Sequence, residues 1–375
     1  MISFRRFAPL TALICLTACS PDPAPAPAPA PAVAPAPESV PAPPAPVSWA
    51  FEPAATFPAD QSLARPEDGV LLTDGRLLVG DEVHGLRLLA DDGSSRPFGG
   101  FAAAGYLHKP PTQEGGANGV ALEADGNHVL VADILGGGIF RVAVDSETTD
   151  LVYQHDHGVN TAVADRAGGI WFTQSTANKQ ADGHAGIFSA VGAPKPDGML
   201  FYLPPATGDT ARIPILRAEG LLFANGIALD EANAAIYLAE TMAHRLLRFR
   251  IDATGALTDR TVLAELVGPD NVELGPDGRL WVAQPISNQI SVIDIASGET
   301  KVAFSIATPA SLATLQQISE RIPRGEGWME LLTPTLWEPA PGLMTGLILA
   351  PDGTPRYWTG LGKAIVRLEG ESGGE

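Results

Sequence analysis

The stretch VELGPDGRLWVAQ, residues 272–284, decides the fold. Two apolar runs flank the pair Asp277-Gly278, and each run has the length of a short β-strand. Asp-Gly between such runs is a strong hairpin signal, because glycine readily adopts the positive φ that a tight turn requires. The stretch therefore predicts two antiparallel strands joined by a short turn.

This pattern recurs six times along the chain. The copies are VLLTDGRLLVGD (70–81), VALEADGNHVLVAD (120–133), AVADRAGGIWFTQ (162–174), IALDEANAAIYLAE (227–240), VELGPDGRLWVAQ (272–284) and LILAPDGTPRYWT (347–359). Most copies are followed by one or two further strand-like runs. Three or four short strands in repeats roughly 45 residues apart are typical of propeller blades. We therefore predict an all-β, six-bladed β-propeller with four-stranded blades.

The ends of the repeat array indicate how the ring closes. The last copy is followed by a single further run at 364–369, so its blade lacks a fourth strand. We expect the stretch 47–57 to supply that strand, because closure removes an exposed sheet edge. Two long insertions, 175–196 and 307–341, have the length of binding loops or lids. The second contains apolar residues at helical spacing and predicts a short helix; the face that the insertions cover stays open.

The first 46 residues predict export and attachment to a membrane. Residues 1–18 have a basic start and a short apolar run, typical of a signal peptide. Leu16-Thr17-Ala18-Cys19 resembles the lipobox of bacterial lipoproteins, which implies lipidation of Cys19. Residues 19–46 are rich in Pro and Ala and predict an extended linker, so the propeller is assigned to 47–375. We expect a lipid-anchored protein of the cell envelope, in the outer membrane rather than the inner.

The net charge limits the partners that the protein can bind, and the cysteine content limits the ways in which the fold can be stabilised. The formal net charge is −19, which argues against nucleic acid and anionic lipid as partners. The two cysteines of the chain, Cys15 and Cys19, both lie in the signal region. The propeller therefore has no disulfide, and its stability comes from burial and from any bound ion.

One register of polar residues runs through all six copies. Counting back eight residues from each turn reaches a polar residue just before the first strand. These residues are Glu67, Asn118, Asn160, Asn225, Asp270 and Thr345. In a propeller the first strand is the innermost, so the six side chains are expected to surround the axis. The alternative is that they are turn formers before strands, a common use of Asn and Asp.

The chemistry of this predicted ring favours calcium. Glu67 and Asp270 supply two carboxylates, and Asn160, Asn225 and Asn271 supply amide oxygens. Calcium binds six to eight oxygens in flexible geometry, with water or substrate completing the set. Zinc prefers histidine or thiolate, and neither occurs in the register.

The local phrases around these residues carry a family resemblance. The chain resembles the calcium-dependent six-bladed propellers of the gluconolactonase (SMP-30-like), paraoxonase and strictosidine-synthase-like group. The phrases are PED (66–68), VNT (159–161), FANGI (223–227), AETMAH (239–244) and PDNV (269–272).

The resemblance implies both a metal site and an activity. Glu67, Asn160, Asn225, Asp270 and Asn271 match the family's central calcium ligands. The implied reaction is hydrolysis of a small-molecule lactone or ester, with Asp270 and Glu67 as catalytic carboxylates. Asn118, Thr345 and Phe223 are expected to line the substrate site.

Two departures from the family pattern narrow the expectation. Asn118 stands where paraoxonases have a histidine, which favours gluconolactonase-like chemistry at the metal alone. Thr161 stands where the family's second calcium has an Asp, so one calcium is expected.

The first alternative function is a non-catalytic envelope binding or scaffold propeller with a structural calcium. The second is a strictosidine-synthase-like lyase, for whose glutamate the last blade offers no counterpart.

Overall fold

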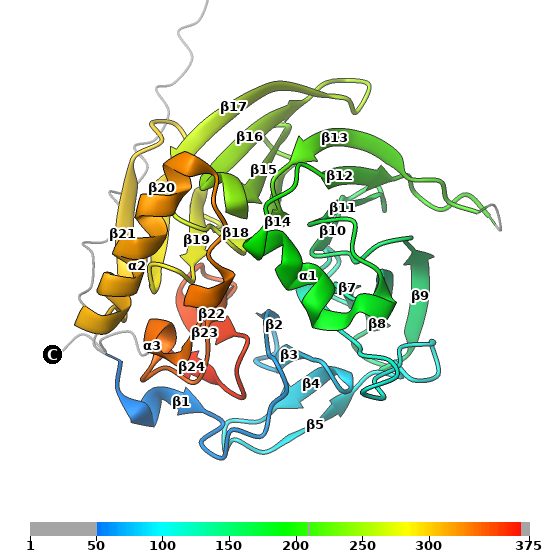
Figure 1. The fold of residues 1–375 in the computed structure, drawn as a ribbon. Coiled ribbons are helices and arrows are strands. Elements are labelled where there is room, and N and C mark those ends of the chain that lie inside the picture. The colour runs from blue at the N-terminus through cyan, green and yellow to red at the C-terminus, as the bar shows by residue number, and fades with distance from the viewer. Residues whose placement is uncertain (1–50, 209–210, 369–375) are drawn as a thin grey trace, which may run out of the picture. The chain divides into compact units, whose positions relative to one another are not determined.

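The computed structural model describes residues 51–208 and 211–368. The predicted signal peptide, Cys19 and the Pro/Ala-rich linker lie outside these residues. Within them, the strands form six four-stranded antiparallel sheets arranged around an axis (Figure 1). This architecture confirms the predicted six-bladed β-propeller.

Each blade is an up-and-down sheet whose strands follow one another in the chain. Blades 1 to 3 contain β2 (Gly69–Leu71), β3 (Leu77–Asp81), β4 (Gly85–Leu89), β5 (Ser95–Phe98); β6 (Ala117–Leu122), β7 (His128–Asp133), β8 (Gly138–Ala143), β9 (Thr149–Gln154); and β10 (Ala162–Ala164), β11 (Ile170–Gln174), β12 (Gly198–Leu203), β13 (Ile215–Leu221). Blades 4 and 5 contain β14 (Ala224–Asp230), β15 (Ala235–Glu240), β16 (Arg245–Ile251), β17 (Leu257–Glu265); and β18 (Val272–Leu274), β19 (Arg279–Gln284), β20 (Gln289–Asp294), β21 (Thr300–Ser305).

The sixth blade is built from both ends of the described chain. It contains β22 (Met344–Leu349), β23 (Pro355–Gly360), β24 (Ile365–Arg367) and, as its outermost strand, β1 (Thr56–Phe57). β1 pairs antiparallel with β24, with Phe57 opposite Ile365. The prediction that an N-terminal strand closes the ring is therefore confirmed.

The first strand of every repeat is the innermost strand of its blade. The inner strands contact one another pairwise around the whole ring: β2 with β6, β6 with β10, β10 with β14, β14 with β18, β18 with β22, and β22 with β2. Each inner strand reverses into the next strand through the predicted turn, where Gly278, for example, has φ 74°. Residues that precede the inner strands are thereby brought to one end of the axis.

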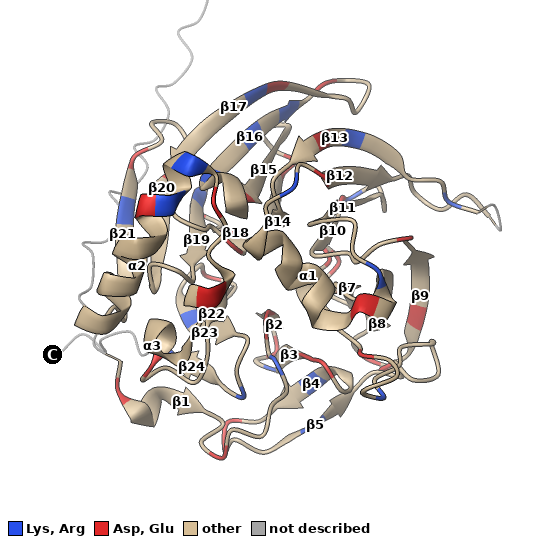
Figure 2. Cartoon of the chain, in the orientation of Figure 1, with Lys and Arg blue, Asp and Glu red and all other residues tan. Residues whose placement is uncertain are grey.

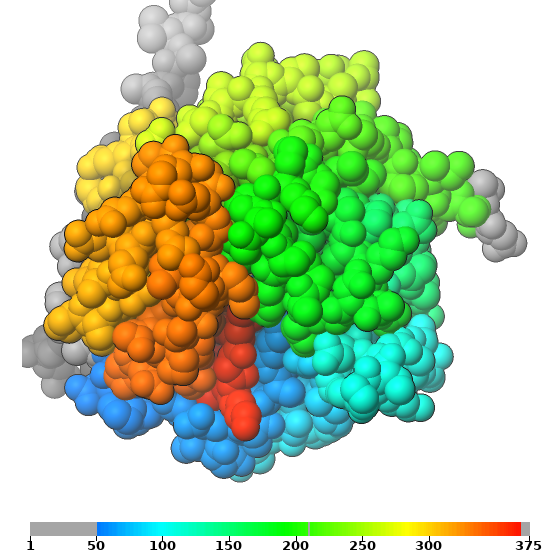
Figure 3. Space-filling view, in the orientation of Figure 1, coloured from blue at the N-terminus to red at the C-terminus, as the bar shows by residue number. Residues whose placement is uncertain are grey.

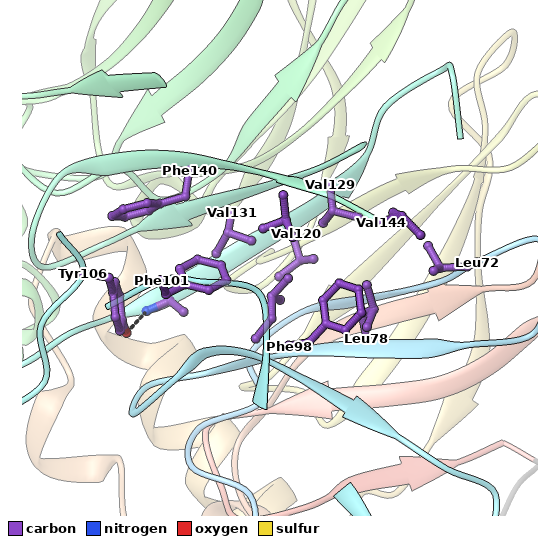
Figure 4. Close-up of a cluster of buried hydrophobic side chains, with 13 residues drawn as sticks. Leu72, Leu78, Phe98, Phe101, Tyr106, Val120, Val129, Val131, Phe140 and Val144 are labelled. Carbon is purple, nitrogen blue, oxygen red and sulfur yellow. Dashed lines mark hydrogen bonds between the residues drawn. The ribbon is translucent and has the colours of Figure 1, made fainter. Parts of the chain in front are cut away.

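The hydrophobic core lies between neighbouring blades. Figure 4 shows one such layer, in which Leu78 and Phe98 of blade 1 pack with Val131 and Phe140 of blade 2. The same arrangement recurs around the ring, and Trp358 is fully buried in the layer between blades 5 and 6. Tryptophans in the strands thus pack between blades, as their position in the repeat indicates.

The two insertions form a roof over one end of the axis. The first contains η2 (Gln180–Asp182) and α1 (Gly183–Gly192); the second contains α2 (Pro309–Arg321), η4 (Ile322–Arg324), η5 (Met329–Leu331) and α3 (Pro334–Trp337). α2 is the predicted helix, and Thr308 caps it by accepting a hydrogen bond from the Ser311 N–H (3.1 Å). α1 was not predicted, because its ten residues lie between glycines and lack a clear apolar stripe.

The insertions meet each other over the centre of this face (Figure 3). The Trp328 N–H donates to the Val191 carbonyl (3.3 Å), and apolar side chains from both insertions share one buried cluster. In the described part of the chain, no helix is long and apolar enough to cross a membrane. The remaining 3-10 turns are η1 (Pro53–Ala55) and η3 (Thr241–Ala243).

Replacing Phe57 by alanine tests the contribution of ring closure. Phe57 is buried, stacks on Tyr357 at 6.2 Å between ring centroids, and lies beneath the Arg367 guanidinium. Phe57→Ala is expected to lower the free energy of unfolding by about 3 kcal/mol or more, measured by chemical denaturation. A change below about 0.5 kcal/mol would show that β1 does not hold the ring closed.

Candidate metal centre and active site

The structure brings the six residues of the predicted register together at one cavity. It lies on the axis beneath the roof and has a volume of about 70 Å³. Its polar lining includes all six: Glu67, Asn118, Asn160, Asn225, Asp270 and Thr345. Phe223, expected to lie at the substrate site, lines the same cavity.

Hydrogen bonds between blades fix the backbone of this ring. The Glu67 carbonyl accepts from the hydroxyls of Thr345 (3.2 Å) and Thr359 (2.7 Å) in blade 6. The Asn118 amide donates to the Asn160 carbonyl of the next blade (3.1 Å). Because each blade binds its neighbour at the axis, the ring side chains have little freedom to move apart.

The amide nitrogens of two ring asparagines are held by neighbouring hydroxyl groups. The amide nitrogen of Asn225 donates to the Thr241 hydroxyl (3.0 Å), and that of Asn160 donates to the Ser175 hydroxyl (2.9 Å). Asn225 Oδ1 and Glu67 Oε2 are buried and have no hydrogen-bond partner. Unpartnered buried oxygens are costly in a folded protein, and a hard cation such as Ca²⁺ satisfies such oxygens.

Without a cation, the ionised forms of the two ring carboxylates are disfavoured. Burial raises the pKa of Glu67 to about 7, although the nearby Arg65 guanidinium and a hydrogen bond from Asn271 act in the opposite direction. Burial and the charge of Glu67 raise the pKa of Asp270 well above its usual range. A divalent cation between the two groups would favour their ionised forms. The donor set thus fits the predicted calcium ion.

Asn271 occupies a different place from the other predicted ligands. Its amide nitrogen donates to Glu67 Oε1 (3.2 Å), and its buried Oδ1 has no hydrogen-bond partner. Asn271 does not line the roofed cavity but lines a cavity at the opposite end of the axis, with Asp68, Thr161 and Glu273. Asn271 therefore supports Glu67 from below the ring.

The carboxylates at this opposite end are also buried. Asp68 accepts backbone N–H groups of Gly69 and Val120, both at 2.8 Å. Burial, together with the charges of Glu273 and Glu67, raises the pKa of Asp68 well above its usual range. Burial raises the pKa of Glu273 to about 8. Burial therefore disfavours the ionised form of both groups.

The walls above the ring are apolar. They come from the propeller loops and from both insertions: Ile134, Ile187, Phe188, Val191, Phe223, Ile286, Trp328, Leu332, Leu343 and Leu361. α1, which crosses this face, carries no Asp, Glu, Lys or Arg (Figure 2). The insertions therefore cover the polar ring with an apolar roof. The sequence alone did not indicate which face they cover.

A second cavity adjoins the first. It has a volume of about 730 Å³ and shares with the axial cavity the residues Arg65, Phe188, Leu332, Leu343 and Leu361. We call it the outer cavity. A ligand too large for the axial cavity can place one group at the ring and the rest of the molecule in the outer cavity.

Arg65 lines the site although it lies outside the register. Its guanidinium donates to Asn118 Oδ1 (2.8 Å) and to the Ala117 carbonyl (3.3 Å), and it lines both cavities. Arg65 lies two residues before Glu67, and this closeness to the register is the sequence feature that could have pointed to it.

A separate acidic cluster lies on blade 2, away from the ring. Glu123, Asp125 and His128 approach one another at the β6–β7 turn. Arg141 already pairs with Glu123 (2.5 Å), and His128 pairs with Asp125 (2.6 Å). These pairs account for the cluster, and we assign no metal to it.

Fold and site together define a class: a six-bladed propeller with an oxygen-rich centre on its axis beneath a roof of insertions. Comparison with known proteins agrees with this class. The family model for the SMP-30/Gluconolactonase/LRE-like region matches residues 153–315. This match confirms, over those residues, the resemblance predicted from the sequence.

Individual relatives are distant. Strictosidine synthase-like 13 of Arabidopsis thaliana is 28% identical over 156 residues, which is 41% of this chain and 36% of the relative. Strictosidine synthase-like 6 of the same plant is 26% identical over 172 residues, 44% of this chain and 43% of the relative. The matches thus span less than half of these relatives. A solved gluconolactonase from Xanthomonas campestris shares the fold, with 18% identity, TM-score 0.55, and coverage of 81% of this chain and 86% of that one.

His244 supports the loop that carries Asp270, and it makes the stability depend on pH. Its Nδ1 accepts the Gly268 N–H (3.1 Å), and burial lowers its pKa from 6.5 to about 4. Between these two values the unfolded chain binds more protons than the folded one. Stability from this group is therefore complete above pH 6.5 and decreases as the pH falls to about 4.

His244→Asn is expected to flatten this dependence, since Asn accepts the same hydrogen bond and tolerates the left-handed backbone at this position (φ 56°). The measurement is the free energy of unfolding of both proteins from pH 4 to pH 8. Parallel curves over this range would contradict the assignment.

Proposed function

We propose that this protein is a calcium-dependent hydrolase of lactones or esters, acting at the axial cavity. The observation that carries the proposal is the convergence of six register residues on one roofed cavity, with unpartnered oxygens on Glu67 and Asn225. The match to the SMP-30/Gluconolactonase/LRE-like region supports a small-molecule lactone as the class of substrate.

Four residues of the cavity would hold the ion. Glu67 and Asp270 balance its charge, and Asn160 and Asn225 add neutral oxygens. When bound, Ca²⁺ would act as a Lewis acid toward a substrate carbonyl. Asn271 keeps Glu67 in place through its hydrogen bond of 3.2 Å.

The remaining chemistry falls to side chains of the chain itself. Asp270 is the proposed base, because it lines the cavity and is only partly shielded there, whereas Glu67 is 2% exposed. It would accept a proton from the attacking water. Asn118 and Thr345 already hold neighbouring groups, so they shape the pocket rather than transfer protons. The apolar roof limits the access of bulk water.

The small volume of the axial cavity favours one alternative. A site of about 70 Å³ beneath a closed roof also suits a structural calcium in a non-catalytic binding propeller. The outer cavity, at about 730 Å³, favours the catalytic function over the structural one, because it gives a substrate room beside the ring.

Turnover by the purified protein tests the catalytic proposal. A panel of lactones and aryl esters is assayed with calcium, with a chelator, and with the Asp270→Asn variant. We expect activity with calcium that falls by about a hundredfold or more in the other two conditions. Calcium binding without turnover of any panel member would favour the binding propeller.

Calcium-dependent stability gives a test that needs no substrate. Calcium at a hundredfold excess over its Kd is expected to stabilise the protein by about 3 kcal/mol. Asp270→Asn should abolish this gain and leave the calcium-free protein as stable as the wild type or more so, because it removes a buried carboxylate beside Glu67.

A matched control for this experiment is Asp133→Asn. Asp133 is also a carboxylate whose pKa is raised by burial, but it accepts backbone N–H groups of Gly116, Leu135 and Gly136 and does not line the cavity. This variant should lose stability and keep its response to calcium. An unchanged response in Asp270→Asn would remove Asp270 from the metal site.

We also propose that the mature protein is attached to the cell envelope through a lipid on Cys19. The lipobox-like phrase at 16–19 and the Pro/Ala-rich stretch that follows support this assignment. Replacing Cys19 by serine is expected to move the protein from the membrane fraction to the soluble fraction of cells. Retention of the variant in the membrane fraction would contradict it.

A further inference from the structure

A strained backbone conformation recurs at an equivalent place in three blades. Two residues before Glu67, Asn225 and Asp270, the backbone is left-handed: Arg65 has φ 54°, Phe223 has φ 62° and Gly268 has φ 54°. Only the third of these is a glycine, the residue that adopts this conformation without steric penalty. Side chains are thus kept at two positions where the backbone alone would favour glycine.

Both of these side chains reach the candidate site. Phe223 lines the axial cavity, and Arg65 lines the axial and the outer cavity. Strained non-glycine residues persist where the side chain serves the site, so the strain points to a role for each of them. For Phe223 an apolar wall is a sufficient role. A half-buried cation requires a different explanation.

Arg65 is held firmly but is not neutralised by a salt bridge. Its guanidinium donates to Asn118 Oδ1 (2.8 Å) and to the Ala117 carbonyl (3.3 Å), both neutral acceptors. Its buried Nε has no hydrogen-bond partner. Among the described residues that line the axial cavity, Arg65 is the one Lys or Arg.

The charges of the cavity do not balance once a divalent ion is bound. Among the described residues that line the axial cavity, Glu67 and Asp270 are the carboxylates; together they offset Ca²⁺, and the charge of Arg65 is then in excess. The walls of the axial cavity above the ring are apolar and screen this charge poorly, so a monoanion in that cavity would be stabilised. The positive charge of Arg65 opposes, without cancelling, the rise that burial causes in the pKa of Glu67 and of Asp270.

Ester or lactone hydrolysis produces such a monoanion at this place. Water adds its oxygen to the carbonyl carbon, the ester C–O bond breaks, and an alcohol, a carboxylate and a proton result. The carboxylate forms where the neutral carbonyl group lay. We propose that Arg65 is an anion-binding residue, which gives the calcium-loaded site a selective affinity for the carboxylate product with an apolar substituent in the outer cavity. This inference rests on the proposed function.

A pair of small probes tests this proposal directly. Hexanoate and hexanamide have the same apolar chain and differ in the charge of the head group. Their binding to the purified, calcium-loaded protein is measured by isothermal titration calorimetry. We expect hexanoate to bind about tenfold more tightly or better, because a charge-assisted hydrogen bond in a shielded site exceeds a neutral one by that order. With chelator present, the preference should disappear.

Variants separate an anion-binding role from a structural one. Arg65→Gln should lose the preference for hexanoate, whereas Arg65→Lys should retain most of it. Lys109→Gln is the matched control, because Lys109 is exposed and lines neither cavity, so this variant should have less than about a twofold effect. Lys363→Gln tests the exposed cation of the outer cavity itself. Thermal melts of each variant establish that it is folded.

Three outcomes would overturn the proposal. The first is equal or absent binding of the two probes to calcium-loaded wild type. The second is an equal loss of affinity for both probes in Arg65→Gln, which would show that Arg65 only positions Asn118. The third is a preference that depends on Lys363 instead. If calcium neither binds to nor stabilises the protein, the proposed function itself is wrong. This result is obtained before any probe is added, so it is distinct from a failure of the Arg65 proposal.

Discussion

The rest of this structure depends on two carboxylates held close to the propeller axis, where they are shielded from solvent. Glu67 and Asp270 come from blades that are far apart in sequence, and ring closure brings them to one cavity. Burial raises the pKa of both, so the arrangement carries a free-energy cost in the absence of a cation. The hydrogen bonds of the ring hold these groups together despite that cost. A site built in this way is prepared for a divalent ion.

The roof turns this charged centre into a place for chemistry on a small molecule. α1 and the segment from α2 to α3 lie over the ring and share one apolar cluster. A shielded site strengthens electrostatic interactions, including those of Arg65, which no carboxylate pairs. The outer cavity then gives the apolar part of a ligand a place beside the ring. Charge at the axis and apolar walls above it are complementary features of one proposed site.

Strained backbone conformations mark two residues of the site that lie outside the register. The register found Glu67 and Asn225 because identical spacing from a turn repeats in every blade. Arg65 and Phe223 precede these residues by two positions, and their left-handed backbone is visible only in three dimensions. Phe223 was found through the resemblance of its phrase to a family, whereas Arg65 lay outside any phrase. No rule of local sequence assigns a charged residue to a conformation that favours glycine.

The sequence by itself determined the blades, the closure of the ring and the six polar residues before the inner strands. Those features depend on local periodicity and turn chemistry, which a single repeat already contains. Tertiary structure decided which face the insertions cover, that Asn271 lies below the ring, and that Arg65 joins the two cavities. These depend on how distant segments pack together. Packing of this kind leaves no periodic pattern in the sequence, because each contact occurs only once.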